Sequence, residues 1–207
     1  MLHAKKQPYN SVWLWADSQK ELGETFIRFQ EFYESPSKQF KNKTFTMGAI
    51  KSWYSSEYGS DMYSDYWVGF NIPSVVLEPF RSGLFDPLTT MEQNLLDIFK
   101  YRHDKFYIIG AQNNSVLRHE LSHALYGYSE KYKTEINSYI QKHNTKFKKI
   151  QTYILKKGYC KEVLNDEIQA YITDNEDEFI QNNLDSNIIS DILSIYKRHR
   201  KHDKKLG

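Results

Sequence analysis

The stretch VLRHELSHAL, from Val116 to Leu125, predicts an amphipathic helix with two histidines on one face. Its leucines recur at every fourth residue, and such a row indicates the side of a helix that faces a core. His119 and His123 have the same spacing, so their imidazoles lie about one turn apart on the same side of the helix. The stretch therefore predicts a buried helix that presents a pair of imidazoles to one point in space.

The residues around this stretch agree with a helix that follows a strand. Residues 105–110, KFYIIG, are aromatic and β-branched and end in a glycine, which is typical of a short strand. Asn113, Asn114 or Ser115 can cap the helix that follows, and Gly127 can end it. The order is therefore strand, tight connection, helix.

The two histidines and the glutamate between them form the pattern His-Glu-x-x-His. On a helix this pattern gives two ligands to one zinc ion. Glu120 lies about 100° round the helix from His119, close to the metal but not bound to it. There it can take a proton from water and return it to a leaving amine. The alternative interpretation is a buried helix whose two histidines are satisfied by hydrogen bonds.

A catalytic zinc site needs a third protein ligand, and the sequence offers three candidate positions downstream. A ligand six residues after the second histidine fails, because that position is Ser129. His143 falls in an apolar stripe of a predicted long helix, from about 129 to 157, so we expect it to be a core residue. Glu167 is favoured, because it stands in a Glu-x-x-Ala segment that is predicted to be helical. The small residue one turn later, Ala170, allows this helix to approach the histidine helix closely.

These segments, His119 to His123 and Glu167 to Ala170, resemble the gluzincins, which are zinc metallopeptidases. The resemblance implies zinc (Zn2+) held by His119, His123 and Glu167, with Glu120 as general base. Many gluzincins carry an aspartate directly after the small residue to orient a zinc-bound histidine, but this chain has Tyr171 there. The orienting group is therefore open among Asp166, Asp174 and a backbone carbonyl.

The resemblance implies peptide-bond hydrolysis by a metal-activated water, most simply as an endopeptidase acting on a polypeptide substrate. Zinc lowers the pKa of its water towards about 7 and polarises the scissile carbonyl. The tetrahedral oxyanion needs a further donor. Tyr171 is the catalytic residue predicted for this role, with Tyr126, Tyr128 and His143 as alternatives. The strand segment Phe106–Ile109 is expected to form the edge of the cleft, where a peptide could add as an extra strand.

Composition limits the class of protein. The chain has 207 residues with 40% hydrophobic and 15% aromatic residues, which argues against disorder. Its net charge of +2 does not by itself indicate a polyanionic partner. One cysteine, Cys160, excludes an internal disulfide and fits a reducing compartment. No signal peptide or membrane span is visible, so a cytoplasmic protein without a membrane partner is expected.

The predicted architecture is α+β and zincin-like. A small N-terminal mixed sheet packs on a mostly helical C-terminal half, and residues 1–207 form a single domain. Strands are expected at 12–15, 75–77 and 105–110, and short strands and turns within the aromatic region 44–70. Further helices are expected from Asp17 or Ser18 to about Tyr33, after the capping box at Thr89, around Glu167, and after Asp185 or Ser186.

Residues 197–207 form a basic C-terminal tail, which we expect to be the only dense charge block of the chain. It could recruit a protease to nucleic acid, although a solvated helix end whose cations complement the helix dipole is the simpler interpretation. A third hypothesis is a zinc-binding interaction module without catalysis. The intact Glu120 argues against this hypothesis, because a structural site needs no base.

Overall fold

The computed structural model describes residues 1–174 and 177–203, without the side chains of residues 201–203. The chain divides into two compact units, Met1–Leu117 and Arg118–Gly207, and each is described by itself. The prediction of one domain over residues 1–207 stays a prediction. Within the described ranges, no helix has the length and apolar character that spanning a bilayer requires.

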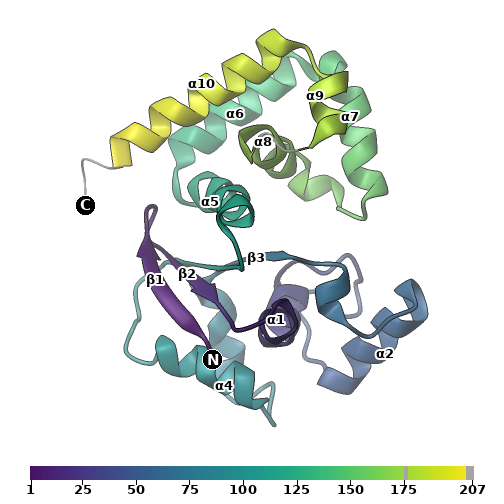
Figure 1. The fold of residues 1–207 in the computed structure, drawn as a ribbon, viewed down its shortest axis with the longest axis vertical. Helices are drawn as coiled ribbons and strands as arrows, with labels where there is room; N and C mark the ends of the chain where they lie inside the picture. The colour runs from purple at the N-terminus through teal and green to yellow at the C-terminus, as the bar shows by residue number, and fades with distance from the viewer. Residues whose placement is uncertain (175–176, 204–207) are drawn as a thin grey trace. The chain divides into compact units, whose positions relative to one another are not determined.

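The first unit contains a four-stranded mixed sheet, as predicted (Figure 1). Its strands are β1 (His3–Gln7), β2 (Ser11–Trp15), β3 (Gly69–Pro73) and β4 (Tyr107–Ala111), in the order β1-β2-β4-β3. β2 pairs parallel to β4, whereas β1 and β3 pair antiparallel to their neighbours. β4 therefore has a partner on both sides, and the prediction that Phe106–Ile109 forms a free edge for a peptide is wrong. The edge strands are β1 and β3.

Helix α1 (Gln19–Glu34) packs against this sheet, and Ser18 caps it as predicted by accepting a hydrogen bond from the Glu21 N–H. The rings of Phe26 and Phe70 stack with centroids 4.9 Å apart and fill the space above β4. Gly110 lies beneath them, and a Cβ added there would come within 2.7 Å of the Phe26 ring. Only glycine therefore allows α1 to approach the sheet this closely.

The aromatic region 44–70 is an α-helix over Met47–Tyr58, and the prediction of short strands and turns is wrong for that part. It forms α2 (Met47–Tyr58) and the 3-10 turn η1 (Tyr63–Asp65). Tyr54 and Tyr63 are buried, and both donate hydrogen bonds to Glu31 of α1, so these rings belong to the core of the unit.

The remaining elements of the first unit connect β3 with β4. The segment predicted as a strand at 75–77 is the 3-10 turn η2 (Ser74–Leu77), which is followed by α3 (Glu78–Arg81) and α4 (Thr90–Ile98). The capping box at Thr89 is confirmed, since its side chain and that of Glu92 bond to each other's backbone N–H.

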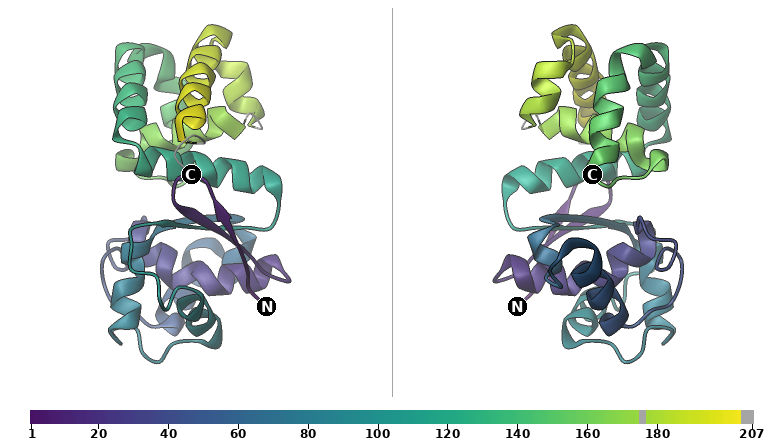
Figure 2. Two further views of the ribbon diagram at one scale, coloured as in Figure 1. Left: turned by 90° about the vertical axis from the view of Figure 1, so that its left-hand side faces the viewer. Right: turned by 90° about the vertical axis from the view of Figure 1, so that its right-hand side faces the viewer.

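The second unit is helical throughout its described part (Figures 1 and 2). It comprises most of α5 (Asn114–Tyr128), then α6 (Glu130–Lys142), α7 (Asn144–Lys156), η3 (Lys161–Val163), α8 (Leu164–Asp174), α9 (Glu178–Asn183) and α10 (Ser186–Asp203). α8 packs against α6, α7 and α10, which makes it the central helix of the unit. The α+β class is thus confirmed.

The long helix predicted from 129 to 157 is two helices. The break falls at His143, which ends α6 and begins α7, and its ring lies over Tyr139 with centroids 4.6 Å apart. The apolar stripe itself is real, because Ile136, Ile140, Phe147, Ile150 and Ile154 are all buried. His143 is partly exposed and is not a member of that stripe.

Part of the basic tail continues α10 as a regular helix. Arg198 and His199 both contact the carboxylate of Glu135 on α6, which offsets some of the tail's charge. Residues 204–207 lie outside the described part of the chain.

Candidate metal centre

The helix that carries the two histidines begins with a side-chain cap. The Asn113 carboxamide oxygen accepts hydrogen bonds from the backbone N–H groups of Ser115 and Val116, at 3.0 and 2.9 Å. Asn113 was one of the three predicted caps. α5 then runs through Gly127 to Tyr128, and this regular geometry places His119 and His123 on one side, with Nε2 atoms 3.1 Å apart.

Glu167 of α8 meets both imidazoles. Its Oε1 lies 3.8 Å from His123 Nε2, and its Oε2 lies 4.0 Å from His119 Nε2. One ligand atom from each of these three residues falls within 4.8 Å of the others, so the group could hold a metal ion. Ligands at about 2.0–2.1 Å from one zinc ion, in tetrahedral directions, lie about 3.3 Å from each other. The separation of the two Nε2 atoms, 3.1 Å, is close to that value, and the two separations from Glu167, 3.8 and 4.0 Å, are longer.

Two aspartates of α8 orient the imidazoles. Asp174 Oδ2 lies 2.5 Å from Nδ1 of His119, and Asp166 Oδ1 lies 2.8 Å from Nδ1 of His123. A carboxylate accepts the Nδ1–H, which leaves the Nε2 lone pair free to bind a metal. The question that the sequence left open is thus answered: each histidine has its own aspartate.

The donor set fits a divalent cation. With both Nδ1 atoms facing carboxylates, two Nε2 lone pairs and the Glu167 carboxylate converge on one point. Glu167 Oε2 is buried and accepts no hydrogen bond from the described residues. Burial raises the pKa of Glu167 to about 7, even though both histidines act to lower it. A buried carboxylate without a hydrogen-bond donor is stabilised by a metal ion, and this combination of residues suits one.

A second set of hydrogen bonds holds Asp166 in place. The Gln169 side-chain amide donates to Asp166 Oδ1 at 2.9 Å. The buried Tyr132 of α6 donates in turn to the side-chain oxygen Oε1 of Gln169 at 2.6 Å. The chain His123–Asp166–Gln169–Tyr132 therefore fixes the imidazole to a third helix. Gln169 and Tyr132 could not be predicted from the sequence, because their hydrogen bonds depend on how α6 and α8 pack.

Helices α5 and α8 approach each other closely at this centre. Ser122 and Thr173 share a hydrogen bond of 2.5 Å between their hydroxyl groups. Ala170, one turn after Glu167, is fully buried. The small residue predicted to allow the approach thus lies within the packed interior.

Glu120 is buried beside the histidines at only 7% exposure. Burial raises its pKa, while the neighbouring His119 and His123 act in the opposite direction. A carboxyl group whose pKa is moved towards neutrality by its surroundings is a suitable general base.

Tyr171 lies against the metal cluster. Its ring packs edge-on to the His119 ring, with centroids 4.9 Å apart. Its hydroxyl lies 3.3 Å from the hydroxyl of Tyr159 and accepts a hydrogen bond from Lys157 at 3.4 Å. Burial raises the pKa of both tyrosines, so both stay protonated donors near neutral pH.

The other candidates for the oxyanion donor lie elsewhere. Tyr126 donates to Asn137 of α6, Tyr128 is exposed, and His143 lies at the junction of α6 and α7. Tyr159 is a further buried hydroxyl at this centre that the sequence does not indicate. Tyr159 follows Gly158, which has a φ of 101°, and its hydroxyl lies 3.3 Å from that of Tyr171 on α8.

No protein-family model, curated protein or solved structure matches the chain. No family is assigned.

Proposed function

We propose that this chain is a zinc-dependent peptidase of the gluzincin type, with a zincin-like arrangement of α5 and α8. One observation carries the proposal: His119, His123 and Glu167 form a ligand set in which each histidine has an orienting aspartate. Two imidazoles and one carboxylate are a common ligand set of catalytic zinc, since they leave a fourth position open for water. Sulfur ligands, which closed structural sites favour, are lacking in this cluster.

The catalytic steps follow from the side chains around the cluster. A zinc ion held there would polarise the scissile carbonyl and make a water molecule acidic near pH 7. Glu120 takes a proton from the attacking water and delivers it to the departing nitrogen. Asp166 and Asp174 keep the two imidazoles in the tautomer that binds through Nε2.

Tyr171 and Tyr159 supply hydrogen-bond donors on one side of the centre. The Lys157 ammonium lies 4.5 Å from the centroid of the Tyr171 ring and donates to its hydroxyl. Tyr171 keeps the role predicted for it, donation to the oxyanion, and Tyr159 either shares that role or fixes the Tyr171 hydroxyl. Removal of one such donor typically costs about a hundredfold or more in kcat.

The test compares metal content and cleavage in matched variants. The wild-type protein should contain one zinc per chain and cleave an unfolded protein such as reduced casein, and a chelator should abolish cleavage. Glu120→Gln should keep the zinc and lose at least about a hundredfold in rate. Glu57→Gln, which makes the same change at an exposed position of α2, should leave both unchanged. Full activity of Glu120→Gln would disprove the mechanism.

A further inference from the structure

Helix α7 and its flanks carry a second dense block of positive charge. Residues 142–161 contain seven lysines and no aspartate or glutamate. The tail at 197–207 is therefore not the only charge block of the chain, and that prediction is wrong. Two of the seven lysines form ion pairs within the unit: Lys146 with Asp185 and Lys157 with Asp177.

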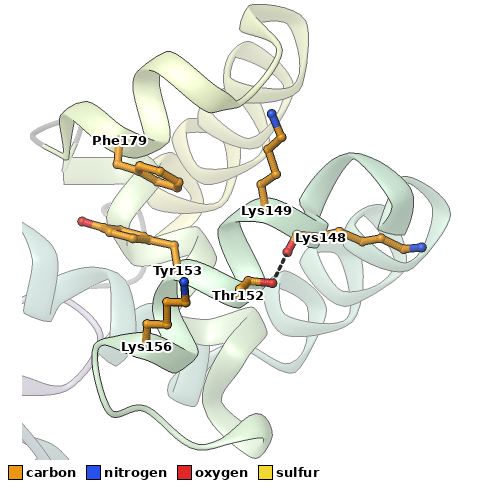
Figure 3. Close-up of a pocket in the computed structure, with 6 residues that line it drawn as sticks. All are labelled: Lys148, Lys149, Thr152, Tyr153, Lys156 and Phe179. Carbon is orange, nitrogen blue, oxygen red and sulfur yellow. Dashed lines mark hydrogen bonds between the residues drawn. The ribbon is translucent and has the colours of Figure 1, made fainter.

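Three of the remaining lysines line a pocket of about 400 Å³ between α7 and α9. Its lining residues are Lys148, Lys149, Thr152, Tyr153, Lys156 and Phe179. Figure 3 shows the ring of Phe179 above that of Tyr153, with Lys149 to the right of the rings, Lys156 below Tyr153, and Lys148 pointing away from them. The two ring centroids are 4.2 Å apart, and Phe179 stays 38% exposed although it is a large apolar residue.

Three of the five polar side chains that line the pocket are lysines, and the Tyr153 hydroxyl donates to Asp177. The Thr152 hydroxyl donates to the backbone oxygen of Lys148, so it is already used. Within the described part of the chain, Lys148, Lys149 and Lys156 form no ion pair with an aspartate or glutamate. An ammonium group donates three hydrogen bonds and accepts none. The pocket thus matches a ligand with anionic groups and an apolar part that can rest on Phe179.

A peptide with acidic side chains fits this surface better than single-stranded nucleic acid does. Nucleic acid needs open aromatic faces on which successive bases can stack. Here Phe179 covers one face of Tyr153, and the Lys157 ammonium lies 4.7 Å from the Tyr153 centroid. Only Phe179 offers an outer ring face, which suits a single apolar side chain between acidic ones.

Lys157 also links the pocket to the metal centre within the same unit. Its ammonium lies 4.7 Å from the Tyr153 ring of the pocket and 4.5 Å from the Tyr171 ring, which packs on His119. An extended chain spans about 3.3 Å per residue, so a bound segment of a few residues can reach both places.

We propose that the pocket between α7 and α9 binds an acidic segment of the polypeptide that the metal centre cleaves. The substrate class is then a polypeptide in which aspartates or glutamates flank an apolar residue a few positions from the scissile bond. That the bound polypeptide is a substrate rests on the proposed peptidase function, but binding of a peptide by the pocket is measurable without cleavage.

The experiment uses the full-length Glu120→Gln protein and two fluorescent twelve-residue peptides. One peptide carries Asp and Glu around a central Leu, and the other replaces each acid with its amide. Fluorescence anisotropy should show binding of the acidic peptide only. Lys149→Glu with Lys156→Glu should weaken it about tenfold or more, whereas Lys149→Arg with Lys156→Arg should retain it.

A charge-matched control separates the pocket from general attraction. Lys131→Glu with Lys197→Glu makes the same change in net charge at exposed lysines that do not line the pocket, and should change affinity less than twofold. Equal losses of peptide affinity in the two double variants would overturn the proposal. A single-stranded oligonucleotide that binds more tightly than the acidic peptide, and whose binding only the pocket variant loses, would also overturn it. Circular dichroism melting curves confirm that each variant is folded.

The outcomes also separate this inference from the proposed function. If the acidic peptide binds through the pocket but the wild-type protein cleaves nothing, the binding proposal stands and the proposed peptidase function is wrong. If cleavage depends on zinc but shows no preference for the acidic peptide and is unchanged in the pocket variant, the peptidase function stands and the binding proposal is wrong.

Discussion

Replacement of Asp166 with alanine should weaken zinc binding about ten- to a hundredfold while leaving the protein folded. Asp166 Oδ1 lies 2.8 Å from His123 Nδ1 and accepts the Gln169 amide at 2.9 Å. Its loss removes the group that fixes the His123 tautomer and leaves Gln169 without its acceptor. The predicted loss in affinity corresponds to about 1.4–2.7 kcal/mol of binding free energy.

Asparagine at the same position should have a smaller effect. Its amide oxygen can still accept the Nδ1–H of His123, but the bond loses the charge of the carboxylate. Charge-assisted hydrogen bonds are about twice as strong as neutral ones, so we expect a loss of about tenfold or less. Asp174→Asn and Asp174→Ala should repeat this pattern through His119, whose Nδ1 lies 2.5 Å from Asp174.

Competition against a chromophoric zinc chelator at pH 7 measures these affinities directly. Asp61→Asn, an exposed aspartate of the first unit, provides a control that should match the wild type. An Asp166→Ala variant that binds zinc within twofold of the wild type would refute the reasoning, since the orienting bond would then contribute nothing to the site.

Three further predictions concern the chemistry and the stability of the fold. Tyr159→Phe should lower kcat by about tenfold or more with KM and zinc content unchanged, measured with a fluorogenic peptide. Arg28→Ala should destabilise the protein by about 3–5 kcal/mol in urea unfolding, because it leaves the fully buried Glu92 without its partner at 2.5 Å. Burial alone would raise the pKa of Asp177, but hydrogen bonds from Lys157, Tyr153 and the Ile180 backbone N–H outweigh it and hold the pKa below the usual value. The stability that Asp177 contributes is then present above about pH 4 and lost as the pH falls through the lowered pKa, so the melting temperatures of wild type and Asp177→Asn should converge in acid.

The candidate metal ligands could be predicted from the sequence because each of the two motifs that carry them is local. His119 and His123 are one helical turn apart, and Glu167 stands in a short helical segment with Ala170 one turn later. The orienting aspartates could only be named as alternatives, since their pairing with a particular imidazole depends on how α8 lies across α5. Tyr159, Gln169 and Lys157 depend on tertiary packing alone.

The errors in the fold have identifiable causes. The serines and aromatic rings of α2 favoured a prediction of strands. In the structure, Thr46 caps this helix, and Gly59, with a φ of 84°, ends it. β1 was missed because an exposed edge strand of polar residues shows no alternation. The break at His143 has no glycine or proline to indicate it.

The position of β4 inside the sheet could not be predicted either. Its apolar sequence fits an edge strand that faces a substrate as well as a central strand that is buried on both faces. The pairing partners β2 and β3 decide the matter, and both lie far from β4 in the sequence.

We propose that His119, His123 and Glu167 together bind one zinc ion. X-ray absorption at the zinc edge on the purified full-length protein, with metal content by mass spectrometry, tests it most directly. One zinc per chain with two imidazole ligands and further oxygen ligands is predicted, and Glu167→Ala should lose the metal whereas His143→Ala should keep it. A protein that binds no zinc, or that keeps full occupancy and the same spectrum in Glu167→Ala, would contradict the claim.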